Sequence, residues 1–450
     1  MNTEYPLFQN FIIYSTIKSL TKITFNFPLE ALFIALFCVF ASFAIIQFLY
    51  LFFVFLRIVF HKKNVLNTIT ETGKTPTFLP VSVIVAAHNE LKNLQKLLPV
   101  LLSQNHPDFE IIVAEDRSYD ESFEYLYDLR AQNPLLRIVR VDETPTHITH
   151  KKYAITLAIK AAKNEILLFT DADCMPQSNN WVTEMSRQFL VEKLENKTEE
   201  KAIILGISPY FGINFQEKTQ EKTQEKANKT GFSFLNFIIQ YETFYTVLQY
   251  MCFALAGAPY MGVGRNLSYK KSLFMNANGF NDFQKLLSGD DDLFVNHQAT
   301  SKNVGICISK ESHIKTYPKK NWKDWYHQKV RHLTTGKHYK LQSKVLLGFY
   351  NFSTVGFWIS QIIILPLIVG YLITTTNLAT IDVKMQLIIL LFSIISLLIM
   401  IIKPLFFVLS AKKMSLKVNF LGILFFDFLY VFYMLIIGTI AIFTKTARWK

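Results

Sequence analysis

The stretch from Ala31 to Leu56 contains no charged residue, and it limits what this chain can fold into. A helix of that length can cross the ~30 Å hydrocarbon core of a bilayer. The run is too long for the apolar part of a secretory signal and lacks a convincing cleavage site, so we predict a retained membrane anchor over residues 31–57. The preceding residues 1–30 mix apolar and polar side chains and are expected to lie on the membrane surface.

The last hundred residues are also strongly apolar. They predict a C-terminal membrane region over residues 347–443 with about three helices. Lys403 followed by Pro404 predicts either a kinked span or a partly interfacial helix. Asp427 is costly in lipid, so it should face protein or a polar cavity; a neighbouring helix that satisfies it is an equally good explanation. The three apolar stretches lie near 347–372, 385–410 and 419–443.

Basic residues beside the apolar stretches predict the orientation of the chain. The formal charge of +13 fits either nucleic acid or a membrane surface. No basic stripe interleaved with aromatic residues is present, so we predict no nucleic-acid partner and assign the charge to anionic lipid headgroups. One side, predicted to be cytosolic, would carry Lys62, Lys63, Lys337, Lys340, Lys344, Lys412, Lys413 and Lys417.

The C-terminal tail resists this scheme. With four full spans, Lys445, Arg448 and Lys450 fall on the opposite side, so either the tail breaks the rule or one candidate does not cross. The cysteines are scattered without a CxxC pair, which argues against a disulfide framework and fits a reducing compartment. The sequence therefore predicts a multi-pass protein of the cell membrane with a cytosolic central domain. The four cysteines are Cys38, Cys174, Cys252 and Cys307.

The central region, residues 78–340, has a different pattern. Short apolar runs rich in β-branched residues alternate with helical stretches, which predicts an α/β domain with a parallel sheet buried on both faces. In such sheets ligands bind at the carboxyl ends of the strands, and polar residues follow every predicted strand except the third. Residues 216–229 form a short polar repeat and are predicted to be a solvated loop. The predicted strands are Val81–Ala87, Glu110–Ala114, Leu135–Val141 and Glu165–Thr170.

Two aspartates follow the fourth predicted strand. In the run Phe169-Thr170-Asp171-Ala172-Asp173, alternate side chains of an extended segment point to one face, so Asp171 and Asp173 can converge on one ligand. Paired carboxylates suit a hard cation such as Mg²⁺ or Mn²⁺, with positions left for diphosphate oxygens. The alternative is an ordinary turn with two solvated acids.

Acidic residues recur at two other sites of the domain. The run AEDRS ends another predicted strand, and a carboxylate there, of Glu115 or Asp116, can accept hydrogen bonds from a base and a ribose. Asp290, Asp291 and Asp292 are adjacent, and their mutual repulsion can raise the pKa of one of them into the range of a general base. A helix N-terminus with favourable acids explains one such cluster, but it does not explain recurrence at three sites.

A basic and aromatic segment precedes the second predicted span. On a helix, Gln328 and Arg331 lie one turn apart on one face, and the planar fork of Arg331 suits a diphosphate. An amphipathic segment at the lipid headgroups is the alternative explanation. The segment runs from Trp322 to His332.

Together these motifs resemble the family-2 glycosyltransferases, especially the membrane-bound branch related to cellulose, hyaluronan and ceramide-glucosyl synthases. The resemblance covers about 78–340 and the flanking membrane segments. It rests on an ordered set of individually degenerate motifs: VSVIVAAHNE, AEDRS, HKKYAIT, TDAD, GDDDLF and QKVRH. It implies a GT-A fold and sugar transfer with inversion from a nucleotide-diphosphate sugar, usually a UDP-sugar.

The resemblance also implies roles for individual residues on the donor side. Glu90 and Asp116 match the uridine-binding acids, and Lys151 matches a lysine beside the donor. Asp171 is expected to contact the nucleotide and Asp173 to ligate the metal.

The remaining implied roles concern catalysis and the diphosphate. Asp291 matches the general base, with Asp290 in support and Asp292 as a further candidate for support. Gln328 and Arg331 match the QxxRW element that holds the diphosphate, although His332 replaces its tryptophan, which puts processive synthesis in doubt.

One loop is expected on the acceptor side. The glycines of the segment 262–266 permit close backbone approach, so we place Gly264, Arg265 and Asn266 there, together with His332. The predicted acceptor is a lipid, a lipid-linked molecule or a glycan. The alternatives are a processive polysaccharide synthase and a non-catalytic membrane protein that binds nucleotide sugar to regulate a partner; a transporter fits four spans with isolated charges less well.

Overall fold

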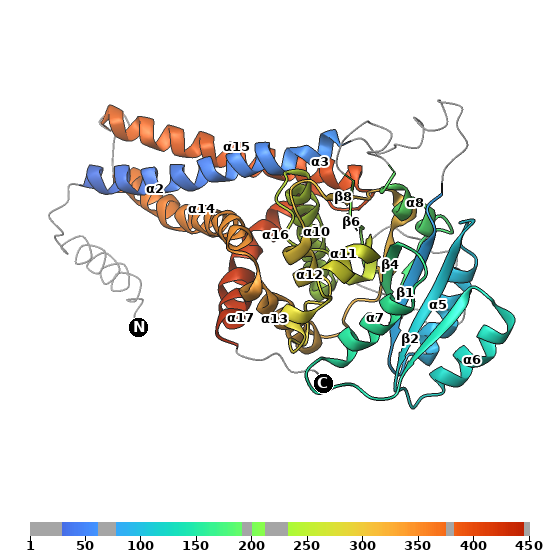
Figure 1. Ribbon diagram of the computed structural model, residues 1–450. Helices are drawn as coiled ribbons and strands as arrows, with labels where there is room; N and C mark the ends of the chain where they lie inside the picture. The colour runs from blue at the N-terminus through green and yellow to red at the C-terminus, as the bar shows by residue number, and fades with distance from the viewer. Residues whose placement is uncertain (1–28, 62–77, 191–199, 212–232, 375–381, 445–450) are drawn as a thin grey trace, which may run out of the picture. The chain divides into compact units, whose positions relative to one another are not determined.

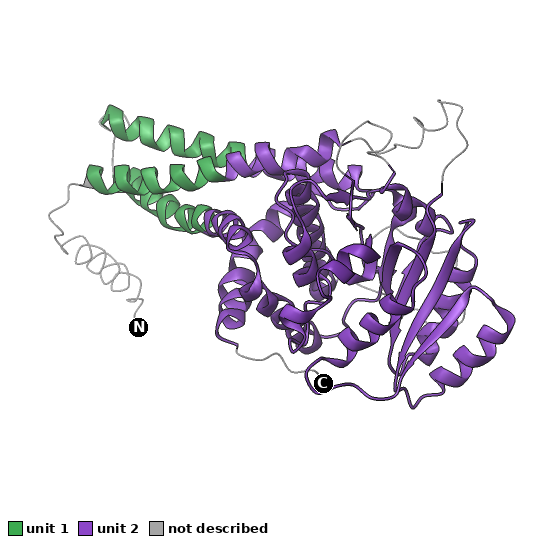
Figure 2. Ribbon diagram, viewed as in Figure 1, with its two compact units in different colours: residues 1–46, 356–399 green, residues 47–355, 400–450 purple. Residues whose placement is uncertain are grey.

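The computed structural model describes residues 29–61, 78–190, 200–211, 233–374 and 382–444. The predicted interfacial segment up to residue 28, the polar repeat 216–229 and the basic residues at 62–63 and 445–450 lie outside the described residues. The chain divides into two compact units (Figure 2). Unit 1 contains residues 1–46 and 356–399, and unit 2 contains residues 47–355 and 400–450.

A seven-stranded sheet forms the centre of unit 2 (Figure 1). Its spatial order is β3-β2-β1-β4-β7-β6-β8, and β7 alone in this sheet runs antiparallel to its two neighbours. The prediction of an α/β domain with a mostly parallel sheet is therefore confirmed. The strands are β1 (Val81–Ala87), β2 (Phe109–Asp116), β3 (Leu136–Val141), β4 (Ile166–Asp171), β6 (Ile203–Leu205), β7 (Leu267–Lys270) and β8 (Val304–Ile306).

Hydrophobic side chains cover both faces of this sheet. Along β1, Val83 and Val85 belong to one buried cluster and Ile84 belongs to the other, as expected for a strand whose side chains alternate between two cores. Helices α5 (Leu91–Leu102), α6 (Ser122–Gln132) and α8 (Trp181–Arg187) contribute to the first cluster. Helices α7 (His150–Ala161), α10 (Phe234–Leu255) and α12 (Asp292–Gln298) contribute to the second.

The register of the strands determines which residues meet at the ligand-binding edge. Ala86 of β1 pairs with Ala114 of β2 on one side and with Asp171 of β4 on the other. Leu267, the first residue of β7, pairs with Phe169 near the end of β4. Because β7 runs in the opposite direction, the loop before it arrives at the edge where β1, β2 and β4 end. A small two-stranded sheet, β5 (Cys174–Pro176) with β9 (Ile314–Thr316), begins just beyond Asp173.

Four helices of the described chain are long and apolar enough to cross a membrane. They are Glu30–Phe60, Leu341–Thr374 (α14), Val383–Lys413 (α15) and Phe420–Phe443. The first comprises α2 (Leu29–Tyr50), a π-helical turn and α3 (Leu56–Phe60), and the last comprises α16 (Phe420–Tyr433), a π-helical turn and α17 (Thr439–Phe443).

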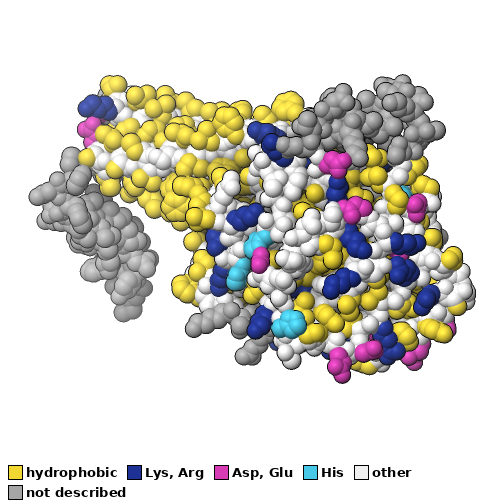
Figure 3. All heavy atoms as spheres, viewed as in Figure 1, with side chains coloured by type: hydrophobic (Ala, Val, Ile, Leu, Met, Phe, Trp, Pro, Cys, Tyr) yellow, Lys and Arg dark blue, Asp and Glu magenta, His cyan; other side chains and the backbone are white. Residues whose placement is uncertain are grey.

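In unit 1, hydrophobic side chains dominate the visible surface (Figure 3). The helices of this unit pack through aromatic rings, and the ring of Phe40 lies 5.6 Å from that of Phe357 and 4.7 Å from that of Phe392. Such an apolar exterior is typical of protein that faces lipid. These features indicate a membrane protein.

A buried ion pair joins two of the apolar helices within unit 2. The Lys403 ammonium lies 2.8 Å from the Asp427 carboxylate, and Tyr245 of α10 donates a hydrogen bond to the same carboxylate at 3.1 Å. Of the two explanations for Asp427, the neighbouring helix is thus the one observed. α15 continues as one helix through Pro404. Gln47 accepts a hydrogen bond from Lys403 at 3.0 Å and itself donates to Ser353 and Thr354.

Candidate active site

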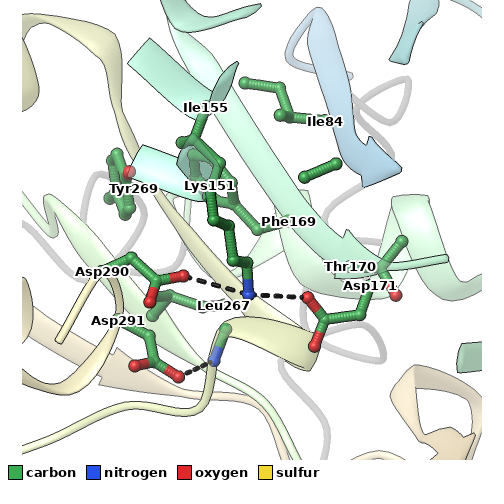
Figure 4. A pocket seen from close by; sticks show the side chains of 12 residues that line it. Ile84, Lys151, Ile155, Phe169, Thr170, Asp171, Leu267, Tyr269, Asp290 and Asp291 are labelled. Atoms are coloured by element: carbon green, nitrogen blue, oxygen red, sulfur yellow. Dashed lines mark hydrogen bonds and ion pairs between the residues drawn. The ribbon is translucent and has the colours of Figure 1, made fainter. Parts of the chain in front are cut away.

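The edge of the sheet at the ends of β1 and β4 opens into a small pocket (Figure 4). Its walls come from five parts of the chain that are distant in sequence. They are the second half of β1, the end of β4, the first half of α7, β7 with the loop that precedes it, and the Asp290–Asp291 turn before α12. The lining residues are Ile84, Ala86, Lys151, Ile155, Phe169, Thr170, Asp171, Gly264, Leu267, Tyr269, Asp290 and Asp291.

Lys151 connects two of the predicted acidic motifs across this pocket. Its ammonium lies 3.0 Å from the carboxylate of Asp171 and 3.1 Å from that of Asp290 (Figure 4). Burial lowers the pKa of Lys151, but the nearby carboxylates outweigh this effect and hold the pKa well above its ordinary value. Lys151 is therefore a fixed positive charge between the two carboxylates.

The three adjacent aspartates have different environments. Burial raises the pKa of Asp290, but the stronger attraction of Lys151 and Lys152 leaves it lowered overall. Burial and the charge of Asp290 raise the pKa of Asp291. Burial and the charge of Asp291 raise the pKa of Asp292 to about 7. Of the two aspartates in the pocket, Asp291 is thus the better proton acceptor near neutral pH.

Backbone N–H groups hold the Asp291 carboxylate in place. Oδ2 accepts a hydrogen bond from the backbone of Gly264 at 2.7 Å, and Oδ1 accepts one from the backbone of Asp292 at 2.8 Å. A Cβ atom at Gly264 would lie 3.2 Å from Oδ2 of Asp291, which explains why a glycine fits here. The predicted acceptor loop and the predicted base are therefore in direct contact.

Lys152 was not predicted as a site residue, but it supports the chain that leads into the aspartate turn. This side chain is buried, and its ammonium donates hydrogen bonds to the carbonyl oxygens of Leu286 and Ser288. Lys152 lies on the buried face of α7 together with Ile155 and Ile159. The sequence signal for the buried role of Lys152 was its helical spacing from these apolar residues, because a lysine on the apolar face of a helix needs buried hydrogen-bond acceptors.

The predicted nucleoside side is built from the loops after β1 and β2. Asn89 and Arg117 both adopt positive φ, at 57° and 53°, which is uncommon for residues other than glycine. Side-chain and backbone hydrogen bonds join the two loops, including one between His88 and the carbonyl oxygen of Asp116 at 2.5 Å. Strained backbone held by such bonds is common at ligand sites.

The two predicted uridine-binding acids lie in these loops. Desolvation raises the pKa of Glu90, and the charges of Asp173 and Asp171 raise it further, so all three carboxylates are close enough to interact. Asp116 is nearly buried and accepts a hydrogen bond from Arg117 at 2.9 Å. Ala114 of β2 is in register with Asp171 across two strand spacings, and Asp116 lies two residues farther along, so Asp116 is roughly 12 Å from Asp171. That separation is suitable for one nucleoside.

Asp171 and Asp173 offer carboxylate oxygens to a common point. The ligand atoms of Asp171, Asp173 and Cys174 lie within 4.8 Å of one another. Cys174 is a poor third ligand, because burial and the neighbouring acids raise the pKa of its thiol well above the ordinary value. The available donor set is thus oxygen alone, which fits a hard divalent cation such as Mg²⁺ or Mn²⁺.

Helix α13 (Trp322–Thr335) carries the QKVRH motif, and a buried ion pair between Lys329 and Glu242 attaches it to α10. Although the His332 side chain reaches the surface, desolvation and the charges of surrounding cations lower its pKa well below the ordinary value. Those cations include Arg331 of the motif and also Arg265 and Lys151, so the end of α13 faces the pocket region. Among the described residues, no hydrogen bond or ion pair joins Gln328 to the pocket acids.

The other members of the predicted acceptor loop have different surroundings. The Arg265 guanidinium lies 5.1 Å from the centre of the Tyr210 ring, and its charge interacts with Asp171, so it faces the acidic site. Asn266 faces away from it. That side chain is fully buried and accepts a hydrogen bond from Trp181 while donating to two backbone carbonyls. The prediction that Asn266 belongs to the acceptor side is therefore wrong, because all its hydrogen-bonding groups are used within the fold.

The acidic motifs, the basic residues and the loop before β7 thus meet at one edge of the sheet. Residues 82–253 match the model of glycosyl transferase family 2. Over these residues, the match confirms the resemblance to family-2 glycosyltransferases.

A relative and two solved structures accompany the family-2 match. Glycosyltransferase AglE from Haloferax volcanii is 32% identical over 104 residues, which are 23% of this chain and 33% of AglE. The chain thus matches about one third of the length of that relative.

The mannosyltransferase PcManGT from Pyrobaculum calidifontis, solved with GDP-Man and Mn²⁺, aligns with a TM-score of 0.45 and 14% identity over 86% of this chain and 99% of its own. TarS 1–349 from S. aureus, solved with UDP-GlcNAc, aligns with a TM-score of 0.38 and 16% identity over 80% and 92%. Structural similarity at this level adds no weight to the family-2 match.

Proposed function

We propose that this protein is a membrane-bound inverting glycosyltransferase. It transfers a sugar from a nucleotide-diphosphate sugar, a UDP-sugar by preference, to a lipid or lipid-linked acceptor. One observation carries the proposal: Lys151 connects Asp171 on the donor side with Asp290 beside the candidate base, 3.0 and 3.1 Å from its ammonium. Residues implied to bind the donor and residues implied to activate the acceptor therefore share one pocket.

The donor occupies the edge formed by the ends of β1, β2 and β4. Glu90 and Asp116 hold the nucleoside, and their carboxylates accept hydrogen bonds from the base and the ribose. Asp173 and Asp171 would hold a divalent metal ion that neutralises charge on the diphosphate as it leaves. Arg331, supported by Gln328 on the same helix, binds the diphosphate with its planar guanidinium.

The acceptor approaches from the side of the loop before β7. Asp291 takes the proton from the acceptor hydroxyl while the hydroxyl oxygen attacks the anomeric carbon. The bond from that carbon to the diphosphate breaks, and the nucleoside diphosphate leaves from the opposite face, so the configuration inverts. Each Asp291 oxygen already accepts one backbone hydrogen bond, and a carboxylate oxygen has a second lone pair available for the proton.

The membrane helices supply the reason to prefer a lipid acceptor. Four apolar helices in the same chain would keep the site near the bilayer, where a lipid hydroxyl or phosphate is within reach. We propose that the catalytic domain lies in the cytosol, because that is the side implied by the basic residues flanking the spans.

The decisive experiment compares wild-type protein with Asp291→Asn in lipid nanodiscs. A panel of nucleotide sugars with Mn²⁺ identifies the donor by release of the nucleoside diphosphate. Asp291→Asn is expected to lose at least ~10³-fold in transfer, because a general base and its alignment supply that much, while UDP binding measured by calorimetry stays within about twofold.

Three outcomes contradict parts of this proposal. Near-normal turnover by Asp291→Asn would remove the base assignment, and the matched variant Asp290→Asn would then be tested as the base. Long products from labelled donor would favour a processive synthase. If the wild-type protein releases no nucleotide from any donor but still binds one, it is a regulator that senses nucleotide sugar.

A further inference from the structure

Helix α12 starts at the residue after the proposed base, so its position determines where Asp291 points. The turn before it requires Gly289, which has φ of 97° and whose Cβ position would lie 2.4 Å from Leu293. Asp291 is the N-cap of the helix, and Asp292 is its first residue. A displacement of α12 would therefore carry the Asp291 carboxylate with it.

Asp292 connects the start of α12 to the segment that enters the membrane region. Its side chain is buried, and Oδ2 accepts hydrogen bonds from the hydroxyls of Thr335 and Tyr339, the latter at 3.0 Å. Thr335 is the last residue of α13, and Tyr339 lies two residues before α14. One carboxylate thus joins the base helix, the helix that carries Arg331 and the start of an apolar helix.

The next turn of α12 repeats this connection. Asn296 accepts a hydrogen bond from the backbone of Lys340 at 2.7 Å and donates one to Ser343 at 3.1 Å. Its side chain also donates to the carbonyl oxygen of Tyr260 at 2.8 Å. Two turns of one helix are therefore fixed to residues 335–343 through buried side chains. This arrangement exceeds what is needed to cap a helix of seven residues.

We propose that Asp292 is a positioning residue, which holds the proposed base Asp291 in place by anchoring α12 to residues 335–343. The inference rests on the proposed function for the role of Asp291, but the anchor itself is a property of the fold. Its consequence is mechanical coupling. A shift of the segment that leads into α14, or of the end of α13 that carries Arg331, moves the base relative to the diphosphate.

The test removes the two hydroxyl groups that bind Asp292 and keeps both side chains close to their original size. In the double variant Thr335→Val with Tyr339→Phe, kcat is expected to fall at least ~10-fold, because small displacements of a catalytic group are costly. The KM for the donor is expected to stay within about twofold, since no donor-binding residue changes. Asp292→Ala should behave likewise. Asp292→Asn keeps polar atoms toward both hydroxyls and should restore kcat to within about threefold of wild type.

The matched control is Thr334→Val with Tyr127→Phe. Thr334 is the neighbour of Thr335 and donates only to the carbonyl oxygen of Arg331 in its own helix, and the Tyr127 ring is 61% exposed on α6. This control should keep both kcat and KM. Equal losses in the control and the test variant, or an unchanged kcat in the test variant, would overturn the proposal.

A second measurement does not depend on sugar transfer. In hydrogen–deuterium exchange, the hydroxyl-free variant should exchange faster than wild type at residues 289–296 and 335–343, with no change in β1–β4. Unchanged exchange at 289–296 would also overturn the anchor. If the wild-type protein transfers no sugar, the proposed function fails, while exchange still decides whether Asp292 holds α12.

Discussion

Two groups of charged side chains in this molecule differ in how their charges are balanced. At the edge of the sheet, Lys151 lies between Asp171 and Asp290, and Asp291 adds a third carboxylate nearby. Between the apolar helices, Lys403 faces Asp427 in a one-to-one pair that Gln47 and Tyr245 complete. The first group has an excess of acids and opens into a pocket, whereas the second is electrically balanced and closed.

The difference separates a site from a structural contact. An excess of carboxylates leaves negative charge that a metal ion can neutralise, so the protein accepts a cost that metal binding removes. A balanced pair with its hydrogen bonds complete has no capacity left for a ligand. Its function is to hold helices in register, and breaking it exposes the full cost of one buried charge.

The largest effect on stability is expected in the membrane region. Lys403→Met leaves the Asp427 carboxylate buried without its cation, which should destabilise the protein by about 3–5 kcal/mol. Thermal unfolding in detergent, followed by size-exclusion chromatography, measures the loss.

The double variant Lys403→Met with Asp427→Leu distinguishes a structural pair from a functional one. It removes both charges and should recover stability to within about 1 kcal/mol of wild type, with sugar transfer retained. Loss of sugar transfer in this stable double variant would show that the Lys403–Asp427 pair takes part in the reaction. The distinction between a structural pair and a functional pocket would then be wrong.

The pocket should respond in the opposite way. Lys151→Met removes the cation between Asp171 and Asp290, so the two carboxylates repel each other and the donor site is disordered. Transfer should fall about 100-fold, while the melting temperature changes less than in Lys403→Met because both partners are partly exposed to solvent. Donor titration by calorimetry and a melting curve in the same buffer check both parts. Normal transfer by Lys151→Met would contradict the assignment of the pocket.

The smallest expected effect is the contribution of Asp292 to the pH dependence of stability, since hydroxyl groups rather than a cation form hydrogen bonds with its buried carboxyl. Its raised pKa of about 7 means that the folded protein binds more protons than the unfolded chain between pH ~4 and ~7. Stability should therefore fall as pH rises through that window, by at most ~1.4 kcal/mol per pH unit, and level off above it.

Asp292→Asn should remove this component, which melting curves at several pH values would detect. The titratable groups that act on Asp292 or feel its charge are Asp291, Lys152, Tyr260 and Tyr339. The pKa values of both tyrosines are raised well above their ordinary value, so Asp291 is the neighbouring acid whose variant must be measured alongside. An unchanged slope in Asp292→Asn would assign the pH dependence elsewhere.

The long strands of the fold were predictable, and the short ones were not. β1 to β4 each contain six to eight residues with apolar runs, and all four were predicted within one to two residues. β6, β7 and β8 contain three or four residues each, too few for a period to appear. Helix α10 escaped prediction for another reason: it is buried around most of its circumference, so its apolar residues show no single stripe.

For the candidate site, the sequence indicated which residue types gather but not how they connect. Asp116 and Asp171 were expected at one edge, because the carboxyl ends of the strands of a parallel sheet share it. Asp290 and Asp291 follow no strand, and only the resemblance to family-2 glycosyltransferases implied that they belong to the site. The bridge through Lys151 and the support from Lys152 depend on the packing of α7, which no local pattern encodes. Asn266 was predicted to lie on the acceptor side because it is in a loop beside glycines. Its side chain is instead buried and accepts a hydrogen bond from Trp181.

The reversed direction of β7 has a consequence for how such proteins diversify. In our proposal the residues that hold the donor lie after β1, β2 and β4 and on α13, whereas the loop whose backbone contacts Asp291 leads directly into β7. The proposed donor residues and the loop beside the proposed base thus belong to different segments of the chain. A change in the loop before β7 is therefore expected to alter the choice of acceptor while the proposed nucleotide-binding residues stay the same. Related proteins could in this way make different products from one donor.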